Sequence, residues 1–217
     1  MYEVDGQTYR LLRVPYHPQG EDPLGSGNSD NFCLPMSLKM VLDFMVDPYQ
    51  KPKYKDHNRS WKFREIQDLL PTMPNLACKV FPGFLDPLSQ ELKCFELRDV
   101  AMTSLDAVEV ELADEKPVIL MFNPRTLTTG RPGGMLHAAV AVGMTKEFVF
   151  VNDPYRASPV RHARARFEMA WSYEPINAIV LRDKPYQQTL GLAETDKYAD
   201  KHEGSPHNTG TGPGVTT

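Results

Sequence analysis

One segment of the chain is apolar on nearly every side of a helical projection. Residues 33–46 read CLPMSLKMVLDFMV, with Pro35 in the first turn and Asp30 or Asn31 available as the N-cap. A helix without a polar face belongs in the centre of a core rather than on its surface. The pattern therefore predicts a buried central helix over residues 33–46.

Amphipathic patterns predict further helices. Residues 104–112 place Leu105, Val108 and Leu112 on one side and carboxylates on the other. The remaining predicted helices are residues 60–70, capped by Ser60, residues 86–93, and residues 165–171. Most of these helices fall in the first half of the chain.

The second half of the chain carries continuous apolar runs that predict strands. The predicted strands are residues 117–122, 137–143, 148–151 and 176–181, preceded by 8–14 and 94–97. Residues 145–147 are a tight connection, so the strands on either side of them should form an antiparallel hairpin. Residues 123–136 are expected to be a loop. Helices followed by consecutive antiparallel strands indicate the α+β class.

The last part of the chain differs in composition from the rest. A sequence of 217 residues suits one folded domain, which we place at residues 1–184. Residues 185–217 hold few large apolar side chains and end in HNTGTGPGVTT. We expect this tail to be disordered.

Charge and cysteine content narrow the classes of partner. The formal net charge is −4, which gives no basic surface for nucleic acid or for an anionic membrane. The chain begins without a signal-peptide pattern and holds no apolar run of about 18 residues. Three scattered cysteines do not form a disulfide framework. We therefore expect a cytoplasmic, reducing setting, while export by a specialised secretion system stays open.

The sequence lacks the usual phosphate-loop, dinucleotide and zinc motifs, so we expect no cofactor and no metal. A candidate for chemistry is Cys33 at the start of the buried helix, where helix N–H groups favour a thiolate. His137 opens one buried strand and Asp153 directly follows the next. Each alone has an ordinary alternative: a buried thiol, a core histidine, and a turn-former before Pro154.

The predicted hairpin changes this assessment. If the strands beginning at residue 137 and ending near residue 151 pair, His137 and Asp153 lie side by side at the open end. A carboxylate beside an imidazole fixes its tautomer, and the imidazole can then deprotonate a thiol such as Cys33. Gln19, upstream of the nucleophile, could hold an oxyanion with its amide, although most loop glutamines have no such role.

Five ordered segments resemble the papain-like double-glycine leader peptidases, cysteine peptidase family thirty-nine, and their stand-alone relatives. The segments are VPYHPQ at 14–19, CLPMSLKMVL at 33–42, KPVIL at 116–120, HAAVAVG at 137–143 and VNDP at 151–154. Residues 167–171 and 176–181 also look like the closing helix and strand of that family. The resemblance covers roughly residues 10 to 182.

The resemblance implies a papain-like fold with Cys33 as nucleophile, His137 as general base, Asp153 as its orienter and Gln19 in the oxyanion hole. The implied reaction is hydrolysis of a peptide or isopeptide bond through a thioester, with a peptide or protein as substrate. Leu34 departs from the glycine usual after the cysteine, and the insert between Gln19 and Cys33 is longer than usual. Acyl transfer to an amine and a non-catalytic peptide-binding module remain alternatives, and Cys78 and Cys94 have no predicted role.

Overall fold

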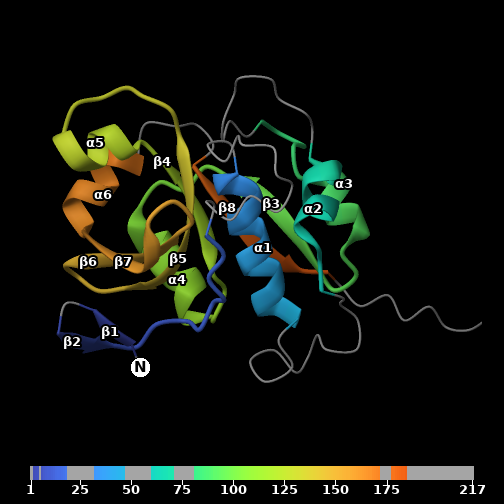
Figure 1. Ribbon diagram of the computed structural model, residues 1–217, viewed down its shortest axis with the longest axis horizontal. Coiled ribbons are helices and arrows are strands. Elements are labelled where there is room, and N and C mark those ends of the chain that lie inside the picture. Colours follow the sequence, from blue (N-terminus) through green and yellow to red (C-terminus); the bar gives the residue numbers. More distant parts are fainter. Residues whose placement is uncertain are drawn as a thin grey trace, which may run out of the picture. The chain divides into compact units, whose positions relative to one another are not determined.

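The computed structural model describes residues 2–4, 6–18, 32–46, 60–70, 81–171 and 177–184 (Figure 1). The helices are α1 (Cys33–Val46), α2 (Phe63–Leu69), α3 (Asp86–Glu91), α4 (Leu105–Ala113), α5 (Pro124–Thr129) and α6 (Arg164–Trp171). The strands are β1 (Tyr2–Val4), β2 (Gln7–Tyr9), β3 (Phe95–Val100), β4 (Val118–Phe122), β5 (His137–Met144), β6 (Phe148–Asp153), β7 (Ala157–Ala163) and β8 (Ala178–Asp183).

The centre of the fold is a six-stranded sheet with the order β3-β8-β4-β5-β6-β7. All of its strand pairs are antiparallel, and β4 to β7 are neighbours in both sequence and space. β8 returns from the end of the described chain and lies between β3 and β4. The predicted α+β class is therefore confirmed.

Helices cover both faces of this sheet, which explains the continuous apolar strands. Alternate residues along β4 and β5 enter two separate cores, because successive side chains of a strand point to opposite faces. One core contains side chains of α1, α2 and α3. The other contains α4 and α6. A strand buried on both faces has no position for a polar side chain, and all five residues of β4 are buried.

α1 fulfils the prediction of a central helix. Eleven of its residues are buried, and it packs most extensively on β5. Small alanine side chains in β5 allow the helix to approach the sheet closely. Near the far end of β5, Gly143 lies so close to Leu11 that a Cβ atom there would meet the Leu11 Cδ2 at 2.3 Å. This contact holds the extended segment before α1 against the sheet.

Several predicted boundaries differ from the structure. The strand expected over residues 8–14 ends at Tyr9, although the Leu12 N–H still donates to the Val142 carbonyl at 2.7 Å. Lys62, not Ser60, caps α2, and its N–H donates to the Glu65 carboxylate. The expected loop over 123–136 contains α5, which Asn123 caps through its side chain. β7 was not predicted at all.

Two other expectations concern residues outside the described ranges. The tail over 185–217 lies there, as do the suggested cap residues Asp30 and Asn31 of α1. Among the described helices, none combines the length and the apolar character needed to cross a membrane.

Candidate active site

Cys33 is the first residue of α1 and is buried at one end of that helix. Its sulfur takes part in a disulfide bond. The sequence had predicted a thiol at this position, so this expectation is wrong for the state that the structure represents. Cys94 is in the thiol form, and Cys78 lies outside the described residues.

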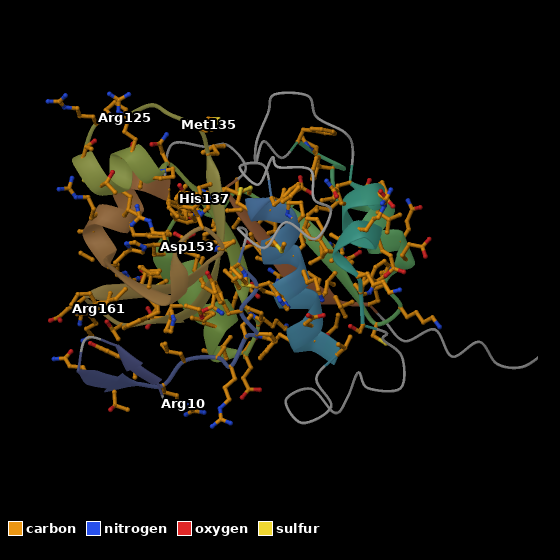
Figure 2. The ribbon with its side chains drawn as sticks, in the orientation of Figure 1. Arg10, Arg125, Met135, His137, Asp153 and Arg161 are labelled. Carbon is orange, nitrogen blue, oxygen red and sulfur yellow. The ribbon has the colours of Figure 1, made fainter. Side chains whose placement is uncertain are left out.

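The hairpin of β5 and β6 brings His137 and Asp153 together, as the spacing predicted. The strands pair antiparallel, with Val140 opposite Asn152, so the first residue of β5 lies near the last residue of β6. His137 Nε2 and Asp153 Oδ1 are 2.7 Å apart (Figure 2). This contact leaves Nδ1 as the ring nitrogen that can exchange a proton with a nucleophile.

The Asp153 carboxylate is held in place by several groups. Its Oδ1 also accepts the Tyr155 N–H at 2.9 Å, and the Arg156 Nε lies 3.9 Å from Oδ2. Burial raises the pKa of the Asp153 carboxyl, but the hydrogen bond and charge of His137, the Tyr155 N–H and Arg156 outweigh this effect. The pKa therefore lies below its ordinary value of 3.8, and Asp153 is ionised at neutral pH.

Aromatic rings fix the orientation of the His137 imidazole. Phe122 at the end of β4 meets it edge to face, with ring centroids 5.5 Å apart. Tyr155 contacts it at 6.5 Å in a similar arrangement. The His137 side chain is only 13% exposed. An imidazole held by two rings and a carboxylate is preorganised, because little rotamer freedom remains to be lost during a reaction.

One hollow of about 270 Å³ lies between Cys33 and the pair of His137 and Asp153. Cys33, His137 and Asp153 all line it, so the structure brings three of the four predicted site residues to one place. Gln19, the fourth, lies outside the described residues. Leu34 is buried in the core shared by α1 and the sheet, so its side chain does not enter the hollow.

Sequence reasoning missed several residues of this site. Tyr155 and Arg156 follow the Asp153–Pro154 turn, and His162 reaches the hollow from β7. Tyr16, which is 137 residues away from Asp153 along the chain, donates its O–H to the Asp153 backbone carbonyl at 3.3 Å. Only Tyr155 and Arg156 carried a sequence signal, their position directly after the predicted turn. Within the described ranges, no three His, Cys, Asp or Glu side chains form a group able to hold a metal ion.

Comparison with known proteins assigns the chain to a family. A family model described as "Peptidase_C39 like family" matches residues 11–178. The chain belongs to this family. The match spans more than half of the sequence and includes Cys33, His137 and Asp153.

Solved structures show the same fold. A crystal structure described as a proposed C39-like peptidase from Bacillus anthracis aligns with a TM-score of 0.55 and 18% identity. The alignment covers 81% of this chain and 100% of that one. At this identity the likeness concerns the fold alone, which is the papain-like α+β fold. Comparison with curated proteins found no match.

Proposed function

We propose that this member of the family, with Cys33 reduced, is a cysteine hydrolase that cleaves a peptide or isopeptide bond. The observation that carries the proposal is the 2.7 Å contact between His137 Nε2 and Asp153 Oδ1 beside Cys33 in one hollow. An orienting carboxylate, a base and a sulfur nucleophile are the components of thiol-dependent acyl transfer. Membership of a peptidase-like family supports the same conclusion.

The proposed cycle begins with opening of the Cys33 disulfide. A dithiol reductant attacks the disulfide and is itself oxidised to a disulfide, and both sulfurs of the protein disulfide, including that of Cys33, leave as thiols. His137 Nδ1 then takes the thiol proton, and Asp153 stabilises the imidazolium that forms. The N-terminal N–H groups of α1 favour the thiolate.

The thiolate attacks the substrate carbonyl and forms a tetrahedral oxyanion, for which Gln19 remains the predicted side-chain donor. The imidazolium returns its proton to the leaving amine, and the C–N bond breaks to give a thioester. Water, deprotonated by His137, attacks the thioester, releases the acid and restores the Cys33 thiol. An amine in place of water would give acyl transfer instead.

The first test measures alkylation of each cysteine by iodoacetamide between pH 5 and 9, with and without dithiothreitol, by peptide mass spectrometry. We expect Cys33 to be protected without the reductant. After reduction it should react well below the ordinary thiol midpoint of about 8.5, whereas Cys94 provides the internal comparison. His137→Ala should remove this low-pH reactivity. A reduced Cys33 that behaves as Cys94 does would contradict the proposal.

Turnover is tested on a library of internally quenched peptides with the reduced protein. Cys33→Ala should abolish cleavage, since it removes the nucleophile and leaves only the residual effect of binding. Cys94→Ala is the matched control and should cleave as the wild type does. Activity that survives in Cys33→Ala would sink the proposal. Adding a primary amine and finding conjugates in place of acid products would favour acyl transfer.

A second candidate function is a peptide-binding module without catalysis, and the Cys33 disulfide is the observation that favours it. A sulfur in a disulfide cannot attack a carbonyl as a thiolate. This alternative predicts that a peptide binds equally well with and without reductant and is never cleaved. Isothermal titration of peptides from the library separates it from the enzyme.

A further inference from the structure

Besides the reacting groups, apolar side chains line a large part of the hollow beside His137. Its inner walls are the side chains of Phe122, Leu127 and Leu136, from the end of β4, from α5 and from the segment before β5. Phe122 and Leu127 belong to the core that α6 also shares, so these walls are firmly packed. Cys33 and His137 form another part of the lining. A group that enters the hollow is therefore next to the bond being broken.

The rim of the hollow carries two exposed apolar side chains. Met135 is 67% exposed and Tyr155 is 69% exposed, the highest values among the large hydrophobic residues of the described chain. Figure 2 places Met135 above His137, at the outer end of the site. Exposed apolar groups beside a hollow commonly contact a ligand, because burying them on binding is favourable. The flexible thioether of Met135 suits ligands of different shape.

The loop that carries Met135 is held in position. Gly133 and Gly134 have φ values of +97° and +113°, a conformation that other residues rarely adopt. Asn123 accepts the Thr126 N–H at 2.9 Å, and its Nδ2 lies 3.4 Å from the Gly134 carbonyl oxygen. The same side chain thus caps α5 and joins the loop to it. The hollow is a built feature of the fold rather than an accident of one surface side chain.

The charged groups near the hollow leave it without a net attraction for charge. Arg156 lies against the Asp153 carboxylate, which His137 also contacts. His162 Nε2 is buried and has no hydrogen-bond partner within the described chain. Burial lowers the pKa of the His162 imidazole below its ordinary value of 6.5, so the ring is neutral at neutral pH. A charged ligand group would lose hydration here, and the charges that it would meet, those of Asp153 and Arg156, are of opposite sign and lie beside each other.

We propose that this hollow binds one large apolar side chain of the substrate, such as leucine, methionine or phenylalanine, immediately next to the scissile bond. The proposal rests on the proposed function and names the substrate class for the same site. The hollow has a volume of about 270 Å³, below the range of about 300–1,000 Å³ typical of sites for whole small-molecule ligands, and it includes the space beside Cys33 and His137. A glycine at this position would leave the apolar walls uncovered.

Binding is tested first without chemistry, on the Cys33→Ala protein with ¹³C-methyl-labelled methionine. Met135 reports from the rim, and Met169 on α6, which is also exposed, is the internal control. N-acetyl-leucine amide and N-acetyl-phenylalanine amide should shift the Met135 methyl signal saturably. N-acetyl-glycine amide and N-acetyl-lysine amide should not, and Met169 should stay unchanged. Equal shifts with all four amides, or none, would overturn the proposal.

Specificity is tested next on the reduced wild type, with the quenched peptides varied on both sides of the cleaved bond. One position next to that bond should favour leucine, methionine or phenylalanine over glycine by more than about 10-fold in kcat/KM, since a single methylene in an apolar pocket is already worth about 10- to 200-fold. Met135→Asp, at the exposed rim, should reduce this preference, whereas Met169→Asp should not. Cleavage with no preference for an apolar side chain at either position would overturn the proposal.

The two experiments separate this proposal from the proposed function. If the apolar amides shift Met135 and no peptide is cleaved, the apolar site stands and the hydrolase proposal fails. If peptides are cleaved with glycine or lysine preferred and Met135 does not respond, the hydrolase stands and the apolar site fails. Leu127→Phe, which reduces the hollow from inside, provides a second variant and should weaken binding of the apolar amides.

Discussion

Two histidine–aspartate pairs in the described part of the chain have the same contact distance and different surroundings. His137 Nε2 lies 2.7 Å from Asp153 Oδ1 at the end of the β5–β6 hairpin. His17 Nε2 lies 2.7 Å from Asp43 Oδ2, on the side of α1. Geometry within each pair therefore does not distinguish a candidate catalytic pair from another.

The neighbours of each pair make the difference. Lys39, one helical turn before Asp43, donates to the same Oδ2 at 2.7 Å and compensates the carboxylate charge. Burial raises the pKa of Asp43, but His17 and Lys39 outweigh it and leave this pKa below 3.8. That pair joins the segment before α1 to the helix. The pair of His137 and Asp153 instead lines the hollow shared with Cys33. A histidine–carboxylate contact indicates catalysis only where a nucleophile lies beside it.

The largest expected effect is the difference in kcat/KM between variants that remove the histidine of each pair. His137→Ala should reduce kcat/KM of the reduced protein by about 10²- to 10⁴-fold, the contribution of a positioned acid–base group. His17→Ala should leave kcat/KM within a few-fold, because His17 contacts Asp43 and Lys39 shares that carboxylate. The measurement is cleavage of the best peptide from the library. Equal losses in the two variants would mean that the pairs do not differ in the way we describe.

A smaller effect concerns stability. Asp43→Ala leaves Lys39 and His17 without their shared acceptor, which should lower the free energy of unfolding at pH 7 by about 1–3 kcal/mol. The folded-state pKa of Asp43 is depressed, so its stabilisation is present above pH 3.8 and disappears as the pH falls through that lower value. Urea unfolding should therefore give curves for wild type and variant that converge in acid. A difference that stays constant with pH would contradict this assignment.

The smallest effect is the pH dependence of stability that His162 contributes. His162 lines the same hollow as His137, and its charged neighbours are Asp153 and Arg156. Its folded-state pKa is lowered, so the unfolded chain binds the proton more readily. Stability should consequently fall as the pH drops below about 6.5. His162→Phe, which keeps a ring against Phe167, should flatten this part of the profile. Thermal unfolding between pH 7.5 and 5 measures the slope, and parallel slopes for both proteins would refute the prediction.

Much of the interior of this protein is readable from local patterns. The bounds of α1 follow from a predominantly apolar run, and the buried face of α4 follows from Leu105, Val108 and Leu112. The neighbourhood of His137 and Asp153 could also be predicted, because a short connection between two apolar strands leaves little choice of pairing. These features depend on residues close in sequence, where periodicity determines which side chains are buried.

Other features depend on contacts between distant segments. β7 is an edge strand of mixed polarity with Pro159 inside it, so neither alternation nor a continuous apolar run marks it. The insertion of β8 between β3 and β4 has no local signal either. The apolar hollow beside His137 arises from residues that meet only after the sheet and α1 have packed. Local patterns thus select the elements and one hairpin, whereas the shape of the site follows from packing, because its walls come from segments that are far apart along the chain.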